Sequence, residues 1–234
     1  MIAAIVNTIT VLIGSSLGLL LRSRFRESLQ DAVMKALALC TVLIGMSSAL
    51  KTEDTLCVIL CMALGTILGE AIRIEDGINS LGDRLKRRFA GGGGDRFTEG
   101  FVTACILFCI GSMTIIGCLE AGLQGDYSTL FAKSTLDLFS SFALASAMGV
   151  GVVFSAAFVL VFQGGLILLA GWIGPVLSAA VVTEMSAVGG VILLGLGVNL
   201  MGLGAKPIRV ANMLPAIFLP VAYLPMAALL TKLF

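Results

Sequence analysis

The polar residues with the clearest chemical potential lie in one segment, residues 126–141. At helical spacing, one face of this segment carries Asp126, Thr129, Lys133, Asp137, Ser140 and Ser141. Lys133 and Asp137 are four residues apart, a spacing that allows a salt bridge on a helix. A charge at the centre of a bilayer costs about 2.5–3.5 kcal/mol on insertion scales, so such residues mark functional sites. We expect the face to line an aqueous path with Asp137 as a cation or proton site; the alternative is a surface helix whose polar face meets water.

Other polar residues within apolar stretches are expected to support such a path. They are Asn7, Glu70, Gln163, Asn199 and Asn212. Asn7 shares a face with Gly14 and Gly18, a pattern that suits close helix packing as well as a cavity.

Breaks in the helices are a second expected feature of such a path. Gln163 precedes two glycines, and a helix break at residues 164–165 would let one bundle rock. Pro215, Pro220 and Pro225 predict a kinked last helix.

Glu184 is expected at a membrane face, and an inward position for it would be notable.

The residue inventory argues against enzymatic, metal and nucleic-acid chemistry. The chain has no histidine, which removes histidine-based catalysis and histidine-ligated metals. Its cysteines include pairs at 57/61 and 105/109, whose spacing is that of one helical turn and not of a zinc ribbon. A net charge of +1 gives no reason to expect a nucleic-acid partner. We therefore expect no enzyme activity, no metal and no cofactor.

The composition is that of a protein that lives in a bilayer. Of the 234 residues, 58% are hydrophobic and only 12% are charged, whereas soluble domains carry about 45–50% apolar and about 25% charged residues. The mean hydropathy is +1.07. The predicted fold class is all-α, a polytopic bundle of transmembrane helices with the lipid bilayer as its first partner.

Apolar runs of about 20 residues define the expected spans. The clearest are residues 1–21, 33–50, 55–72, 100–119, 185–205 and 210–231. Residues 138–183 contain no charge and are too long for one helix. Two passes fit, with a turn either at residues 163–165 or at residues 149–151. The prediction is about eight spans, with six spans plus a re-entrant hairpin as the alternative.

Basic residues orient these spans, because cytoplasmic loops collect lysine and arginine. With residue 1 outside and eight spans, twelve basic residues fall inside and three outside. The inner set is Arg22, Arg24, Arg26, Lys35, Arg73, Arg84, Lys86, Arg87, Arg88, Arg96, Lys206 and Arg209. We therefore expect both termini to be extracytoplasmic.

One segment is expected to lie on the membrane surface. Residues 74–89 alternate an apolar face with a charged one and end in Lys86, Arg87 and Arg88, a pattern typical of an interfacial helix that meets anionic lipid. Four glycines follow. The predicted organisation is a three-span unit at 1–90 that ends in this helix (about 72–90), a linker at 91–96, and a five-span unit at 97–234. A short likeness between residues 43–46 and 109–113 is compatible with internal repeats.

The sequence resembles the YqgA/YdfK-like bacterial inner-membrane proteins, the family of domain of unknown function 554. The resemblance runs nearly end to end and rests on short motifs. These are residues 1–18 with Asn7, residues 65–70, residues 111–113 with Gly117 and Glu120, Lys133-Ser134 with Asp137, Gln163-Gly164, Glu184 with residues 187–190, and residues 212–215. The resemblance implies a multi-pass protein of the bacterial inner membrane, of a family usually described as transport proteins, and leaves the activity open.

Three functions are compatible with these features. The leading hypothesis is a secondary transporter (permease) for an ion or small polar solute, coupled to H⁺ or Na⁺, with Asp137 and Lys133 as the ion-responsive element. The second is a non-transporting scaffold or sensor that works through the basic interfacial helix. The third is a passive channel. The small residues of several spans suit a homo-oligomer and intrachain packing equally.

Overall fold

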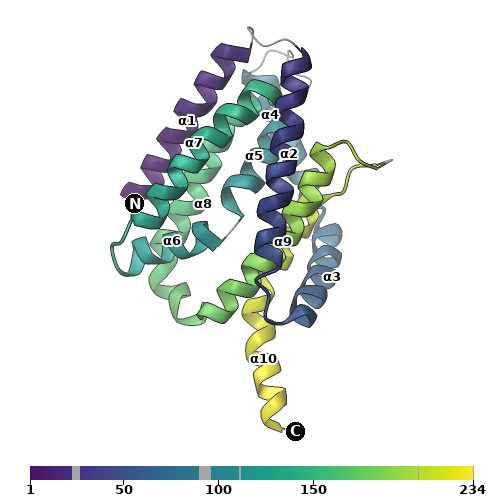
Figure 1. Cartoon of the computed structure of the whole chain (residues 1–234). Helices are drawn as coiled ribbons and strands as arrows, with labels where there is room; N and C mark the ends of the chain where they lie inside the picture. Colours follow the sequence, from purple (N-terminus) through teal and green to yellow (C-terminus); the bar gives the residue numbers. More distant parts are fainter. Residues whose placement is uncertain (23–26, 90–95, 111, 205, 234) are drawn as a thin grey trace.

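The described part of the chain is helical and contains no strand. The computed structural model describes residues 1–22, 27–89, 96–110, 112–204 and 206–233. In chain order the helices are α1 (Ile2–Arg22), α2 (Glu27–Ala49), α3 (Thr55–Ile72), α4 (Ile74–Phe89), α5 (Phe97–Cys109), α6 (Ser112–Leu123), α7 (Ser128–Met148), α8 (Gly151–Ile173), the 3₁₀ turn η1 (Gly174–Val176), α9 (Ala179–Leu200), the 3₁₀ helix η2 (Val210–Phe218) and α10 (Pro220–Leu233). Figure 1 shows them as a bundle of long, roughly aligned helices, which confirms the predicted polytopic all-α fold.

Five helices are long and apolar enough to cross a membrane: α1, most of α2, α3, α8 and α9. Two bent pairs, α5 with α6 and η2 with α10, raise the number to seven if each pair is one span. α7 has 21 residues, the length of a span, but its polar side chains lower its hydropathy. The described residues therefore give five to seven candidate spans by length and composition, where the sequence predicts about eight. The outer faces are apolar: Leu64 and Ile67 of α3, for example, are exposed.

The uncharged stretch at 138–183 forms parts of three helices. Its first turn lies at residues 149–151, one of the two positions that the sequence predicts. α7 ends at Met148, and Gly149 adopts a φ of +91°, a conformation that favours glycine. α8 then continues through Gln163, Gly164 and Gly165 without interruption. The expected break at residues 164–165 is therefore wrong, because packing of α8 against α1, α5 and α6 keeps the segment helical through the two glycines.

The fourth predicted span is broken instead. Residues 100–119 were expected to form one helix, but α5 ends at Cys109, Ile110 is extended, and α6 begins at Ser112. The axes of the two helices differ by 57°. Glycine and serine are weak helix formers and lie next to the break in the sequence, although Gly111 itself is outside the described residues. The predicted kink in the last span is present, since η2 and α10 meet at 41°.

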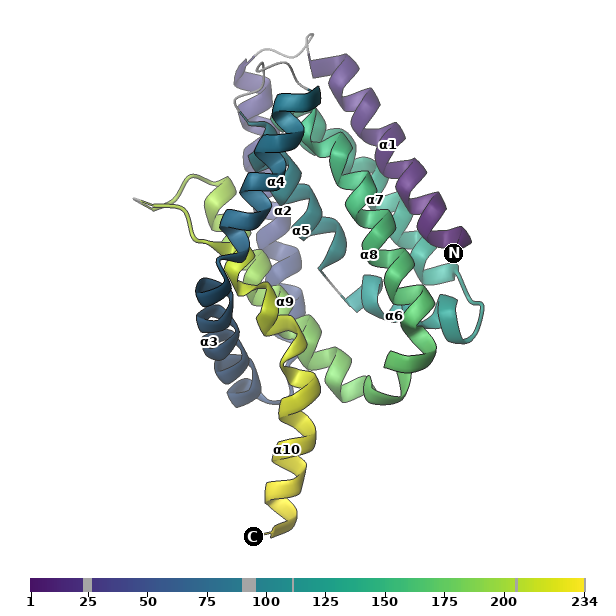
Figure 2. The same ribbon diagram turned by 180° about the vertical axis from the view of Figure 1, so that it is seen from behind.

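The helices pack as two bundles (Figures 1 and 2). The first bundle contains α1, α5, α6, α7 and α8, with α1 lying along α7 and α8. The second contains α2, α3, α9, η2 and α10, with α2 along α9 and α3 along η2. The bundles touch along a seam where α2 meets α7 and where α5 and α6 meet α9. The segment predicted to be an amphipathic helix forms α4, which contacts α5 and η2. Most of the predicted linker at 91–96 lies outside the described residues.

Glycines allow the closest contacts inside each bundle. In the first bundle, Gly14 and Gly18 of α1 face the backbone of α7, and a Cβ at Gly18 would overlap the Phe142 carbonyl oxygen. In the second, Gly65 and Gly69 of α3 face the backbone of η2. Small residues are the usual means by which helices approach closely in a bilayer. The glycine faces read from the sequence therefore serve packing.

Replacing Gly18 tests this close approach. We expect Gly18→Ala to destabilise the protein by about 1–3 kcal/mol, because α1 must move away from α7 to admit the methyl group. Gly165→Ala is the matched control, since no atom lies within 4 Å of a Cβ at that position. The control should be neutral or stabilising, as alanine favours a helix over glycine by about 1 kcal/mol. Thermal unfolding in detergent measures both, and equal effects would contradict the packing model.

Candidate functional site

The predicted salt bridge between Lys133 and Asp137 forms, and Asn7 joins it. Lys133 Nζ donates to Asp137 Oδ1 at 2.9 Å and to Oδ2 at 2.7 Å. Asn7 Nδ2 of α1 donates to Asp137 Oδ2 at 2.9 Å. All three residues are buried, with 0% of Asn7, 6% of Lys133 and 5% of Asp137 exposed. The result is a net-neutral network in which both carboxylate oxygens of Asp137 are occupied.

The network depends on the glycine contact between α1 and α7. Asn7, Gly14 and Gly18 share one face of α1, and that face is buried. Gly14 brings α1 against the Leu138 carbonyl. Asn7, which lies two helical turns before Gly14 on α1, therefore reaches Asp137. Lys133, Asp137 and Ser141 of the polar face of α7 are buried, whereas Thr129 and Ser140 of the same face are half-buried.

Asp126 does not belong to this face. α7 begins at Ser128, and the exposed Asp126 precedes it. Its Oδ1 accepts a hydrogen bond from the Ser128 backbone N–H at 2.9 Å. This hydrogen bond lowers the pKa of Asp126 below its ordinary value. The expectation that Asp126 shares a helical face with Lys133 and Asp137 is wrong, because the bond to Ser128 keeps it in the turn before α7.

Two apolar clusters enclose the network from either side. The Phe108 cluster includes Val11, Phe108, Cys109, Leu144 and Val159. The Leu130 cluster includes Ala4, Cys118, Leu130 and Ile167. Along α1, Asn7 falls between the two clusters, and along α7 so does Asp137. α5 ends in the Phe108 cluster, while α6 contributes to the Leu130 cluster. The break between α5 and α6 therefore lies at the level of the charged network.

Gln163 occupies the same level on α8, between Val159 and Ile167. Its side chain is fully buried, and neither Oε1 nor Nε2 has a hydrogen-bond partner among the described residues. An unsatisfied buried polar group costs about 1–3 kcal/mol, so natural proteins keep few of them. We call Asn7, Lys133, Asp137 and Gln163 the polar layer. These residues come to one level on three helices, although no hydrogen bond among the described residues joins Gln163 to the other three.

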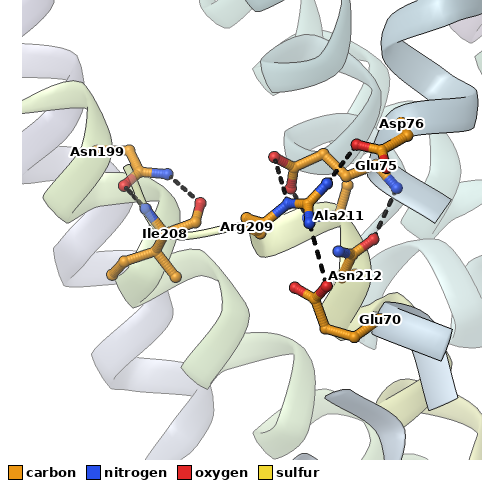
Figure 3. Close-up of polar contacts among 8 residues, drawn as sticks. All are labelled: Glu70, Glu75, Asp76, Asn199, Ile208, Arg209, Ala211 and Asn212. Carbon is orange, nitrogen blue, oxygen red and sulfur yellow. Dashed lines mark hydrogen bonds and ion pairs between the residues drawn. The ribbon is translucent and has the colours of Figure 1, made fainter. Parts of the chain in front are cut away.

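A second polar cluster surrounds Arg209, just before η2 (Figure 3). The guanidinium contacts Glu70 at the end of α3, with NH1 3.1 Å from Oε2, and also Asp76 of α4. Its Nε lies 3.7 Å from Glu75 Oε1. Three carboxylates therefore share one guanidinium, which ties the ends of α3, α4 and η2 together. We call these four residues the Arg209 cluster.

Backbone groups complete the Arg209 cluster. The Glu75 backbone N–H donates to Asn212 Oδ1 at 2.7 Å, and Glu75 Oε2 accepts from the Ala211 backbone N–H at 3.3 Å. Burial raises the pKa of Glu75 above its ordinary value and outweighs the opposing effects of the Ala211 hydrogen bond and the Arg209 charge. Arg73, between α3 and α4, has a φ of +56° and turns the chain so that the acidic residues converge.

Asn199, the remaining predicted polar residue, forms two hydrogen bonds with the Ile208 backbone and so holds the loop between α9 and η2. Its Nδ2 donates to the Ile208 carbonyl at 2.7 Å, and its Oδ1 accepts from the Ile208 N–H at 2.8 Å. Both bonds are visible in Figure 3. The seven predicted residues therefore do not share one site. Three form the charged network, and Gln163 lies at its level. Glu70 belongs to the Arg209 cluster, Asn212 accepts a hydrogen bond from the Glu75 backbone of that cluster, and Asn199 holds the loop beside it.

Glu184 is a buried acid whose partners could not be read from the sequence. It lies on α9, is 2% exposed, and accepts from Thr52 Oγ1 at 2.6 Å. It also accepts from the backbone N–H groups of Glu53 at 2.8 Å and Asp54 at 3.2 Å. These groups precede α3, whose N-terminal dipole favours a negative charge. Glu184 thus points inward and fixes the α2–α3 turn to α9.

The cysteines and acids of the described residues form no group suited to a metal ion. Cys57 and Cys61 lie side by side on α3, with their sulfur atoms 3.8 Å apart, and are free thiols. The chemistry available at the polar layer is therefore that of a carboxylate, an ammonium group and two amides. Such a set can exchange a proton or a small cation.

The fold and the buried charges define a multi-pass helical membrane protein. Comparison with known proteins places it further: the chain belongs to the family described as "Protein of unknown function (DUF554)", whose model matches residues 2–224. It is 30% identical to the "Uncharacterized membrane protein YdfK" of Bacillus subtilis (strain 168), over 224 residues that make up 94% of each chain. It is also 30% identical to the "Uncharacterized protein YqgA" of Escherichia coli (strain K12), over 237 aligned positions that cover 100% of this chain and 99% of that protein. No solved structure matches.

Removing one charge of the buried pair should be far worse than removing both. We expect Asp137→Ala to destabilise the protein by about 3–5 kcal/mol, because Lys133 stays buried without a counter-charge. The double variant Lys133→Met with Asp137→Leu should recover most of that loss. Asp126→Ala, in the exposed turn, is the control and should change stability by less than about 0.5 kcal/mol. Thermal unfolding in detergent tests the cycle, and an additive double variant would argue against a coupled pair.

Removing Arg209 should loosen α4. In Arg209→Gln the carboxylates of the cluster repel one another, so hydrogen exchange across residues 74–89 should become faster. The effect should shrink as the pH falls, because protonation removes the repulsion, and Glu75 protonates at a higher pH than an ordinary glutamate. Lys206→Gln, an exposed cation in the preceding loop, is the matched control. Unchanged exchange in Arg209→Gln would mean that the cluster does not hold α4.

Proposed function

We propose that this protein is a secondary transporter of the bacterial inner membrane that moves an ion or small polar solute, coupled to H⁺ or Na⁺. The observation that carries the proposal is the network of Asn7, Lys133 and Asp137, a charge pair buried between two apolar clusters at the level of a broken helix. Bilayers tolerate such charges rarely, and those that are kept are usually functional.

In the proposed mechanism, Asp137 is the coupling group. A proton on Asp137 would remove its charge, and a bound cation would compete with Lys133 for its oxygens. Either event releases Lys133 and weakens the bond from Asn7, so that α1 and α7 no longer favour the same packing. A change at this one contact therefore reaches both the polar layer and the seam where α2 meets α7.

In the proposed mechanism, the break between α5 and α6 lets one bundle rock. The sequence analysis predicted this role for a break at residues 164–165. Discontinuous helices are common in transporters, where they place backbone dipoles at a binding site and allow one half to move. Here the break faces the polar layer and belongs to two helices that touch α9 across the seam. Movement of the first bundle against the second is the expected conformational change.

The distribution of basic residues supports an orientation with both termini outside. α1 ends at Arg22, which contacts the Gly149 turn, and α4 ends at the same end of the molecule in Figure 1. We propose that this end faces the cytoplasm. The opposite end, where α2 passes into α3 and η1 into α9, would then face outward.

A scaffold or sensor is the second candidate, because the charged face of α4 with Arg87 and Arg88 is exposed. Such a protein would act through α4, so deletion of residues 74–94 would abolish its cellular phenotype while variants of the polar layer stayed silent. A passive channel, the third candidate, would conduct without coupling and without saturation.

Reconstitution in liposomes tests the proposal. Under an imposed pH or Na⁺ gradient, we expect the wild-type protein to change the fluorescence of a trapped pH indicator or Na⁺ indicator faster than empty liposomes. Asp137→Asn should reduce this flux at least about tenfold, since an amide neither titrates nor replaces the carboxylate charge. Asp126→Asn is the control and should behave as wild type. Undiminished flux in a monodisperse Asp137→Asn protein would remove Asp137 from the mechanism.

A further inference from the structure

A cavity of about 490 Å³ lies on the seam between the bundles, separate from the polar layer. One wall is α6, another is the start of α9, and Lys51 from the α2–α3 turn also lines it. Its polar lining residues are Lys51, Glu120, Gln124, Thr183 and Ser186. It lies toward the end of the molecule where α2 passes into α3, the end proposed to face outward. Pockets of this size hold small molecules.

Two polar atoms on this lining have no partner in the described part of the chain. They are Oε2 of Glu120 on α6 and Oγ of Ser186 on α9, and both atoms are buried. Ser186 as a whole is only 3% exposed. Each buried polar group of a folded protein ordinarily has a partner. Glu120 and Ser186 come from different bundles and both line this cavity, so a ligand with hydrogen-bond donors, bound between them, is the partner that would satisfy both.

The charges of the cavity define the ligand further. Glu120 and Lys51 carry opposite charges and line the same space, yet in the described residues neither forms an ion pair. A ligand with one positive and one negative group would neutralise both. An ammonium group fits Glu120 and Ser186, which accept its hydrogen bonds, and an acid group fits Lys51.

The rest of the lining is apolar, and one of its residues also borders a second, apolar chamber. Leu119, Leu123 and Val182 line the polar cavity. Leu177 borders both this cavity and a chamber of about 540 Å³, whose walls include Phe101, Ile106 and Phe162. An apolar side chain on the ligand would therefore lie against Leu177, whereas a polar side chain would lose its hydration there.

The geometry points to a binding site for a small zwitterion with an apolar side chain, that is, for a molecule of the amino-acid class. This inference rests on the proposed function only in naming the solute that the permease carries; binding itself is independent of transport. The position on the seam, with ligands from α6 and α9, means that a bound zwitterion bridges the two bundles. Movement of the bundles would open or close the site.

Calorimetric titration of the purified full-length protein tests the assignment with three matched probes. Leucine is the zwitterion, 3-methylbutylamine lacks its carboxylate, and 4-methylpentanoate lacks its ammonium group. We expect leucine to bind at least about tenfold more tightly than either analogue. Serine, a zwitterion with a polar side chain, should bind more weakly than leucine.

Two variants assign the charges. Glu120→Gln should weaken leucine and 3-methylbutylamine at least about tenfold and leave 4-methylpentanoate unchanged. Lys51→Gln should weaken leucine and 4-methylpentanoate and leave 3-methylbutylamine unchanged. Glu53→Gln and Lys206→Gln, two exposed residues outside the cavity lining, are the charge-matched controls and should bind all probes as wild type does.

The outcomes separate this inference from the proposed function. Leucine that binds no better than its analogues, or variants that affect all three probes alike, would overturn the zwitterion site. If leucine binds as expected while flux is insensitive to Asp137→Asn, the site stands and the coupling mechanism fails. If flux depends on Asp137 but leucine does not bind to the wild-type protein, the coupling mechanism stands and the site assignment fails.

Discussion

The contact between α1 and α7 is the constraint on which the first bundle depends. Glycines at positions 14 and 18 let the two backbones approach, and this approach brings Asn7 to Asp137. Without it, a lysine and an aspartate would face lipid or an empty interior, where a charge pair recovers too little energy to offset its desolvation. The apolar clusters on either side exclude water and strengthen the pair. The packing of α1 on α7 and the charged network therefore depend on the same contact, which is why we propose that a change in the charge of Asp137 alters the packing.

The sequence predicted what is local and missed what depends on distant partners. The Lys133–Asp137 bridge follows from a spacing of four residues, and the end of α4 follows from its charge pattern. The Asn7 partner lies 130 positions from Asp137, and the groups that bind Glu184 lie about as far from it. No periodicity encodes such pairs. Asn7 and Asn199 look alike in the sequence, yet one meets a carboxylate and the other a backbone turn.

The positions of the helix breaks also depend on tertiary contacts that the local sequence does not reveal. Two glycines after Gln163 suggested an interruption, but α8 is packed along much of its length and stays helical. The apolar run at 100–119 suggested continuity, but the chain changes direction after Cys109. Intrinsic propensity is a weak guide when tertiary contacts decide which segment stays helical. The proline-rich last span was predictable because a proline removes the N–H donor whatever surrounds it.

Three acids of the protein differ in the partners that their carboxylates have. The difference indicates which carboxylate lacks a partner that a ligand would supply. Asp137 has a lysine and an amide, and Glu184 has a hydroxyl and two backbone donors, so both are complete without a ligand. Among the described residues, Glu120 keeps a buried oxygen without a hydrogen-bond partner, and so does Ser186, which lines the same cavity. A completed network suits a group that must hold the structure until it is protonated or displaced. An incomplete network on the seam between two bundles suits a group that binds a solute, so we propose that coupling and binding belong to different acids.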